Sequence, residues 1–266
     1  MNSPILFTPR WRLLPLSLCL LLALGLLLTW WWAPTRQFWD VFDLAAFRTL
    51  NGSLDGNELW ARIWGVANMR LTDLAVGLTM LLLLIRRDWA FDGPNLRAGL
   101  YGYVALLLLM VLIRVGLLAQ ILGGLDLNRN SPSLVQEGVV RLSALFPDWN
   151  RQWHMKDASN QSFPGDHAAV LLLWGMYLWA FADTRKRLYV AALSILFVMP
   201  RMISGAHWVT DILVGSISLC LVTVGIGLYT PYMAYAVRAL ARLGAPIFRV
   251  LEKLPLLSRI SLISGR

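Results

Sequence analysis

The segment from residue 200 to 211 concentrates three side chains that can handle a phosphoryl group. Arg201 precedes His207 by six residues, and Asp211 follows His207 by four. On a helix, a step of four places two side chains on one face, so Asp211 is expected to accept a hydrogen bond from one ring nitrogen of His207. A histidine held in this way is oriented and more basic, which suits a nucleophile or a proton carrier. The arginine adds a fixed fork of donors for a tetrahedral oxyanion such as phosphate.

A second histidine lies upstream, in the segment 162–167, which reads SFPGDH. His167 can share a site with His207 where both lie at the same membrane surface. Gly165 and Asp166, directly before it, are candidates for contacting the substrate or shaping the site. An acidic residue after Pro164 also suits the first turn of a helix, so a purely structural role of Asp166 stays open.

The composition indicates a membrane protein. Hydrophobic residues make up 58% of the 266 residues and charged residues only 15%, whereas a soluble domain carries about a quarter charged residues. The net charge of +9 is best explained by Arg and Lys flanking membrane spans, so no nucleic-acid partner is expected. Cys19 and Cys220 lie in apolar runs, and the three histidines have no acidic cluster near them. Neither a disulfide framework nor a metal cofactor is therefore expected.

The predicted fold is all-α, a polytopic bundle of six transmembrane helices with an interfacial amphipathic helix after the first span. A crossing takes roughly 20 residues, and residues 1–230 form a single membrane domain followed by a basic tail, 231–266. Arg114 falls within the third span, where an ionisable side chain is costly and needs a partner. The predicted spans are 13–33, 71–87, 98–122, 164–182, 188–203 and 206–230. The apolar residues at helical spacing in the interfacial segment are Phe38, Trp39, Phe42, Ala46, Phe47 and Leu50.

Six spans place both termini on one side of the membrane. Lys and Arg are more numerous on that side, which favours cytoplasmic termini. Segments 34–70 and 123–163 are then periplasmic. The same topology brings the cationic and histidine side chains together at the outer surface, which supports a single site there. These side chains are Arg129, Lys156, His167, Arg201 and His207.

Such a set of side chains suits phosphoryl transfer from a lipid. His207 would attack phosphorus and form a phosphohistidine, and Asp211 would stabilise the developing imidazolium. His167 would protonate the leaving oxygen and later act as a base on the acceptor. Arg201 and Arg129 would bind the phosphoryl oxygens and stabilise charge in the transition state.

Three motifs carry a resemblance to the type 2 phosphatidic acid phosphatase superfamily. The pattern Arg201-x5-His207-x3-Asp211 resembles its third motif, and the segment 164–167 (PGDH) resembles its second motif, usually Pro-Ser-Gly-His. Arg129, just before Ser-Pro, sits where the first motif falls. The resemblance covers the whole six-span plan.

Within that superfamily, the segments 156–167 and 205–208 are similar to the bacterial lipid A phosphotransferases (lipid A 1-diphosphate synthases). This resemblance implies transfer of a phosphoryl group from undecaprenyl diphosphate to the 1-phosphate of lipid A, at the periplasmic face of the inner membrane. Lys156 is a candidate to replace the lysine missing from the first motif. Asn68 and Arg70, with Asp73, are candidates to hold the acceptor phosphate or to shape the site, with capping and interfacial anchoring as an equal alternative.

Two other functions stay open. A phosphatase acting on undecaprenyl diphosphate or another lipid phosphate would use the same residues with water as the acceptor. A non-catalytic lipid-binding or transport protein is disfavoured, since no internal repeat is visible and the ionisable residues gather at one surface. The expected partners are lipid substrates in the membrane, with no cofactor and no obligate protein partner.

Overall fold

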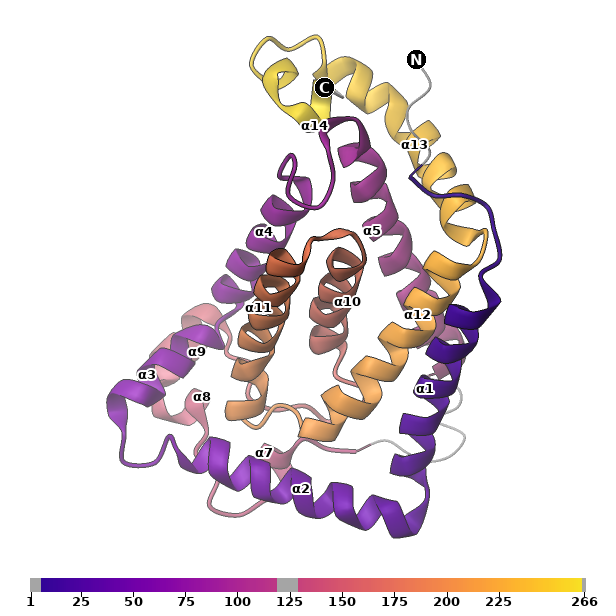
Figure 1. Cartoon of the computed structure of the whole chain (residues 1–266). Coiled ribbons are helices and arrows are strands. Elements are labelled where there is room, and N and C mark those ends of the chain that lie inside the picture. Colours follow the sequence, from indigo (N-terminus) through magenta and orange to yellow (C-terminus); the bar gives the residue numbers. More distant parts are fainter. Residues whose placement is uncertain (1–5, 119–128, 265–266) are drawn as a thin grey trace.

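The computed structural model describes residues 6–118 and 129–264, and all the secondary-structure elements assigned within them are helices. The protein is therefore all-α, as predicted (Figure 1). The longer helices are α1 (Leu13–Trp31), α2 (Ala33–Gly52), α3 (Glu58–Ala67), α4 (Arg70–Ile85), α5 (Leu96–Leu112), α10 (Asp166–Phe181), α11 (Thr184–Ile203), α12 (Ile217–Tyr229) and α13 (Tyr232–Leu251). The shorter helices are α7 (Pro132–Val135), α8 (Leu142–Leu145), α9 (Pro147–Trp153) and α14 (Ser261–Ser264).

Three helical stretches in the described residues are long and apolar enough to cross a bilayer, namely Leu13–Trp31, Gly93–Gly116 and Asp211–Tyr229. α10 is apolar but shorter. α4 and α11 coincide with the two remaining predicted spans. The chain is thus a membrane protein, and the count of six spans stays a prediction.

The start of the predicted span 188–203 differs for a local reason. α11 begins at Thr184 because the Asp183 side chain accepts a hydrogen bond from the backbone N–H of Lys186 at 3.1 Å and caps the helix. α5 continues into a π-helical turn, Ile113–Leu118. The predicted end of that span, 119–122, lies outside the described residues.

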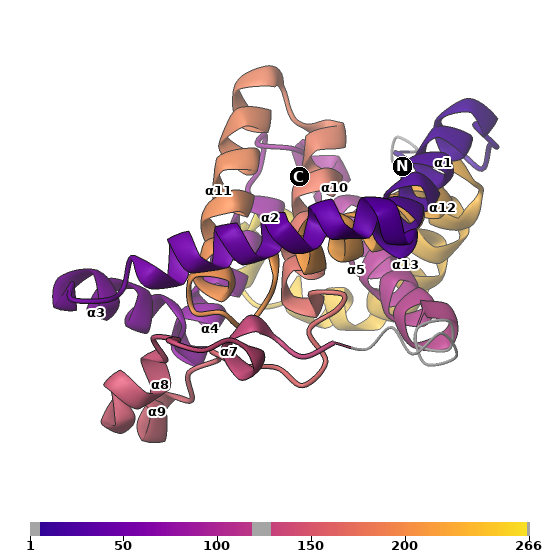
Figure 2. The same cartoon turned by 90° about the horizontal axis from the view of Figure 1, so that it is seen from below.

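The spanning helices run roughly side by side, and α2 crosses their lower end in Figure 1. α3, α7, α8 and α9 lie at that same end, as the view from below also shows (Figure 2). α13 and α14 lie at the opposite end. α13 packs against α5 and buries Met233 and Val237, so this part of the tail is built into the bundle.

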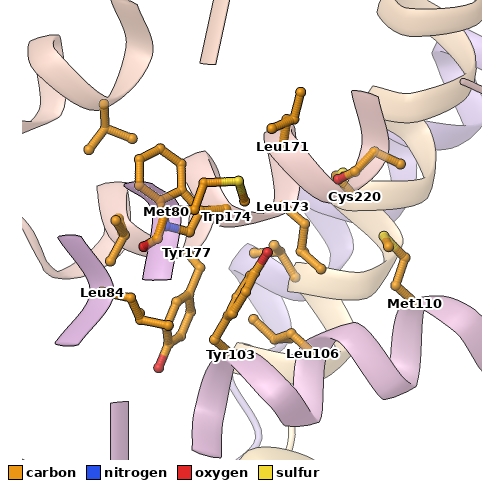
Figure 3. Packing of buried hydrophobic residues seen from close by; sticks show 14 of the residues in the cluster. Met80, Leu84, Tyr103, Leu106, Met110, Leu171, Leu173, Trp174, Tyr177 and Cys220 are labelled. Atoms are coloured by element: carbon orange, nitrogen blue, oxygen red, sulfur yellow. The ribbon is translucent and has the colours of Figure 1, made fainter. Parts of the chain in front are cut away.

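α10 is fixed in the bundle by two buried aromatic residues (Figure 3). Trp174 donates its indole N–H to the carbonyl of Met80 in α4 at 3.1 Å. The hydroxyl of Tyr177 donates to the carbonyl of Gly99 in α5 at 2.8 Å. Because α10 carries His167 in its first turn, these contacts also hold the position of that histidine.

The predicted amphipathic helix is present as α2, but its inward face is partly polar. Asp43, Phe47 and Asn51, spaced four residues apart, are buried against the bundle, while the side chain of Phe38 is 77% exposed. The Asn51 side chain donates to the carbonyls of Val140 and Ile203, both at 3.0 Å. The apolar residues of the predicted spacing are therefore divided between the two sides of α2, since Phe38 and Phe42 are exposed whereas Phe47 is buried. The buried polar residues join α2 to the segments around the site.

Candidate active site

A cavity of about 330 Å³ lies where the start of α4, the start of α10 and the end of α11 meet the segment 156–164. It brings together seven of the eleven residues named as candidates for the site, Asp73 included. Its lining consists of Arg70, Asp73, Lys156, Ser159, Gln161, Pro164, Asp166, His167, Arg201 and His207. Of the other four predicted residues, Asn68 contacts the lining residue Arg201 and Asp211 contacts the lining residue His207. Gly165 lies between the lining residues Pro164 and Asp166 in the chain, and Arg129 lies behind them, next to Asp211.

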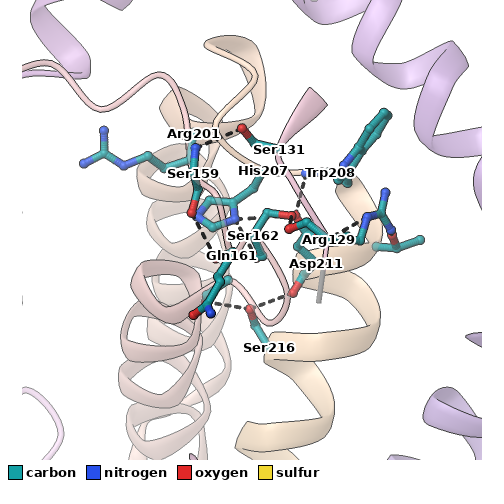
Figure 4. Close-up of polar contacts among 12 residues, drawn as sticks. Arg129, Ser131, Ser159, Gln161, Ser162, Arg201, His207, Trp208, Asp211 and Ser216 are labelled. Carbon is teal, nitrogen blue, oxygen red and sulfur yellow. Dashed lines mark hydrogen bonds and ion pairs between the residues drawn. The ribbon is translucent and has the colours of Figure 1, made fainter. Parts of the chain in front are cut away.

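His207 is held mainly by a backbone group that the sequence did not reveal. It lies just before the helical turn that begins at residue 209, so it does not share a helical face with Asp211 as predicted. Its Nδ1 is 2.9 Å from the carbonyl oxygen of Ser162 and 3.5 Å from Oδ2 of Asp211. A carbonyl oxygen can only accept, so Nδ1 carries the proton in this contact, and in a neutral imidazole Nε2 is then the nitrogen with the lone pair. Figure 4 shows this arrangement.

Asp211 is fully buried and holds the turn that carries His207. Its Oδ2 accepts from the backbone N–H of Trp208 at 2.8 Å, the reverse bond of a helix capping box. Its Oδ1 has no hydrogen-bond partner within the described residues and lies 3.9 Å from Nε of Arg129. An adjacent guanidinium compensates the charge of this carboxylate, which would otherwise be costly to bury.

Arg129, predicted to bind phosphate, is placed differently. Its Nη2 donates to Asp43 at 2.8 Å, its Nη1 donates to the Thr210 hydroxyl at 3.0 Å, and its guanidinium stacks on Trp208. It does not line the cavity, and in Figure 4 it lies on the other side of His207 from Arg201. The structure therefore shows Arg129 as a support of the His207 turn.

The anchor of that support is Asp43 in α2. Besides Arg129, it accepts hydrogen bonds from the backbone N–H of Thr210 at 2.9 Å and from the Thr210 hydroxyl at 2.5 Å. Burial raises the pKa of the Asp43 carboxyl, whereas the positive charge of Arg129 and the bonds from Thr210 act in the opposite direction. Sequence reasoning missed Asp43 because its partner lies 167 positions away.

Arg201 is buried, lines the cavity and has both terminal nitrogens held by its neighbours. Its Nη1 donates to Oδ1 of Asn68 at 2.9 Å, and its Nη2 lies 2.7 Å and 2.5 Å from the two carboxylate oxygens of Asp73. Asn68 is itself completely buried and donates to the carbonyl of Pro200 at 3.0 Å. This geometry supports a role of Asn68 in shaping the site rather than in holding the acceptor phosphate.

The remaining predicted residues surround the start of α10. Asp166 pairs with Arg114, whose Nε is 2.8 Å from Oδ1, so the described structure supplies the partner that the sequence could not identify for Arg114. Gly165 accepts from the Ser216 hydroxyl at 2.8 Å and has no room to spare beside it, because an added Cβ would lie 3.1 Å from that oxygen. Lys156 and Arg70 add positive charge to the cavity wall.

Across residues 6–118 and 129–264, no group of three or more His, Cys, Asp and Glu side chains is arranged to hold a metal ion. The cavity offers histidines and cations, which suit an anionic phosphate ester.

Comparison with known proteins agrees with this chemistry. Residues 103–235 match the PAP2 superfamily model. The chain belongs to the PAP2 superfamily. It is also 31% identical over 215 residues to lipid A 1-diphosphate synthase of Escherichia coli (strain K12), a match that covers 79% of this chain and 85% of that protein. No solved structure gives a significant match.

These matches confirm the resemblance inferred from the motifs. The protein is a PAP2 enzyme similar to lipid A 1-diphosphate synthase, and it is a phosphotransferase or phosphatase that acts on lipid phosphates. The PAP2 match contains His167, Arg201, His207 and Asp211.

Proposed function

We propose that this PAP2 enzyme transfers a phosphoryl group from undecaprenyl diphosphate to the 1-phosphate of lipid A, giving lipid A 1-diphosphate and undecaprenyl phosphate. The observation that carries the proposal is the convergence of His167, Arg201 and His207 on one cavity, in a chain similar to lipid A 1-diphosphate synthase. The cations Arg70 and Lys156 in the same cavity suit two substrates that both carry phosphate.

In the first half-reaction, Nε2 of His207 attacks the terminal phosphorus of the donor. The N–P bond forms as the bridging P–O bond breaks, and undecaprenyl phosphate leaves with its oxygen protonated by His167. The Ser162 carbonyl holds the proton on Nδ1, and Asp211 lies close enough to stabilise the imidazolium charge. Arg201 stabilises the equatorial oxygens of the transferred group.

In the second half-reaction, an oxygen of the acceptor phosphate attacks the phosphohistidine. The N–P bond breaks, the new P–O–P linkage forms and His207 is regenerated. His167, now unprotonated, accepts the proton of the acceptor where the attacking oxygen carries one. The reaction needs no external oxidant, reductant or cofactor.

We place the site at the periplasmic face of the bacterial inner membrane, with both termini in the cytoplasm. The excess of Lys and Arg on the side of the termini supports this orientation. The cavity and α2 lie at the end of the bundle opposite α13 and α14, as this topology requires.

The deciding experiment uses purified protein in liposomes with undecaprenyl diphosphate, with and without lipid A 1-phosphate. Gain of one phosphate by lipid A, with little free phosphate, supports transfer. Acid-labile phosphoprotein should be trapped in the wild type and be absent from His207→Ala. The matched control is His154→Asn, since His154 is exposed and does not line the cavity.

The alternative is a lipid-phosphate phosphatase that uses the same residues with water as the acceptor. Equal release of free phosphate with and without lipid A, together with unchanged lipid A, would establish hydrolysis and overturn the transferase. Full activity of His207→Ala would overturn both mechanisms.

A further inference from the structure

The Asp73 carboxylate lies between Arg201 and His167, which have different roles in the proposed mechanism. It lies in the first turn of α4, and both its carboxylate oxygens contact Nη2 of Arg201, at 2.7 Å and 2.5 Å. Its Oδ1 is also 3.6 Å from Nε2 of His167. One carboxylate thus joins the start of α4 to the start of α10 and to the last turn of α11.

The burial of these groups makes the contact strong. The Arg201 side chain is only 4% exposed, so its charge needs a partner within the protein, and Asp73 supplies the one ion pair within 4.0 Å that Arg201 makes in the described structure. The Asp73 and His167 side chains are each 32% exposed and both face the cavity. The carboxylate is therefore next to the reacting groups without being sealed from solvent.

The contact also determines orientation. Asn68 holds Nη1 of Arg201 while Asp73 holds Nη2, so the plane of the guanidinium is set from two directions. The nitrogen of His167 nearest to Asp73 is Nε2, so the same carboxylate restricts the direction in which that nitrogen points. A general acid must lie within hydrogen-bond reach of the leaving oxygen, which makes such restriction valuable.

We propose that Asp73 is a positioning residue, whose carboxylate holds His167 and Arg201 in the geometry that phosphoryl transfer requires. This proposal rests on the proposed function, in which His167 moves the proton and Arg201 holds the phosphoryl oxygens. Asp73 neither attacks phosphorus nor gains or loses a proton in the reaction. Its effect is transmitted through the two side chains that it contacts.

The test compares Asp73→Asn with Asp73→Glu and with Asp148→Asn. Asp148 is a matched control because it is exposed, pairs with Arg151 on α9 and does not line the cavity. Asp73→Asn is expected to lower kcat about 100-fold, within the usual range for a general acid and its support, and to change KM for the donor less than about 3-fold. Asp73→Glu should recover part of kcat, and Asp148→Asn should match the wild type.

A double-mutant cycle separates positioning from a general structural effect. Because Asp73 acts partly through His167, Asp73→Asn should cost less activity in a His167→Gln background than in the wild type, whereas independent effects would multiply. Thermal unfolding and size-exclusion profiles in detergent identify any variant that does not fold. Should Asp73→Asn fail to fold, the cycle is carried out with Asp73→Glu.

Three results would overturn the proposal. The first is multiplicative losses in the cycle, and the second is activity of Asp73→Asn within 2-fold of the wild type. The third is a lower KM and tighter vanadate binding in Asp73→Asn, which would mean that the carboxylate merely competes with phosphate. All variants are also assayed for hydrolysis of phosphatidic acid. If the wild type hydrolyses lipid phosphates without transferring them, the transferase proposal fails while the hydrolysis data still decide the role of Asp73.

Discussion

Arg114 and Asp166 form an ion pair, with Nε of the arginine 2.8 Å from Oδ1 of the aspartate, between the π-helical extension of α5 and the first residue of α10. Each of these two charges would be unfavourable without the other. An arginine within a membrane span needs a compensating group, and a carboxylate beside an anionic substrate needs a cation. Arg114 therefore neutralises Asp166, the aspartate of the second motif.

Breaking this pair should weaken substrate binding more than it weakens the fold. Arg114→Gln leaves the Asp166 carboxylate without its cation at the cavity wall, so KM for the diphosphate donor should rise about 3- to 10-fold, or roughly 1 kcal/mol. Arg114→Gln/Asp166→Asn should return KM toward the wild-type value. Because Asp166 is 68% exposed, unfolding stability should change by less than about 1 kcal/mol. Equal KM values for the single and double variants would contradict this account.

Removing Arg129 should destabilise the protein strongly. Arg129→Gln leaves Asp43 and Asp211, both almost inaccessible, without their nearest cation. Loss of one partner of a buried pair costs about 3–5 kcal/mol, which should appear as a lower midpoint of thermal unfolding in detergent. Arg151→Gln, which breaks an exposed pair, is the control and should leave the midpoint unchanged. An Arg129→Gln midpoint equal to that of the control would show that the network is not structural.

A side chain at Gly165 should press on the helix that follows His207. The Cβ of Gly165→Ala would lie 3.1 Å from the hydroxyl of Ser216, whose proton is shared between the carbonyls of Gly165 and Asp211. Overpacking of this kind costs about 1–3 kcal/mol, and kcat should fall with it. Gly52→Ala provides the control, because nothing lies within 4 Å of the added carbon. Indistinguishable unfolding midpoints for the two variants would contradict the predicted contact.

The proposed topology can be checked by labelling single cysteines in intact and permeabilised cells. Starting from a chain in which Cys19 and Cys220 are replaced, Glu58→Cys at the start of α3 should react with a membrane-impermeant maleimide from outside the inner membrane. Ser258→Cys, at the opposite end of the bundle, should react only after permeabilisation. The reverse pattern would place the cavity on the cytoplasmic side.

The sequence predicted the helical fold and much of the cavity, because long apolar runs and motif spacing are local signals. His167, Arg201 and His207 were found in this way. The support around them was harder to predict. The contact to His207 comes from a backbone carbonyl, that of Ser162, which leaves no mark in residue types. The role of Asp43 depends on a tertiary contact with Thr210 across most of the chain.

For Arg129, the sequence predicted a residue of the right type but not the direction of its side chain. Its position in the sequence matched a phosphate-binding motif, but a motif defines a residue type and not the direction of its side chain. With Asp43 and Asp211 both buried nearby, the guanidinium is drawn to these carboxylates instead of to the cavity. The competing charges lie on separate elements, and only the folded chain brings them together.

The enclosure of Arg201 has a consequence for each turnover. Its guanidinium is already fixed by Asn68 and Asp73 before a lipid arrives, so the side chain has little conformational freedom left to lose when phosphate binds. An arginine that samples many rotamers would lose more than 1 kcal/mol on being ordered. The anion-binding centre is in this sense preorganised, and more of the free energy of substrate binding remains for stabilising charge as the phosphoryl group moves.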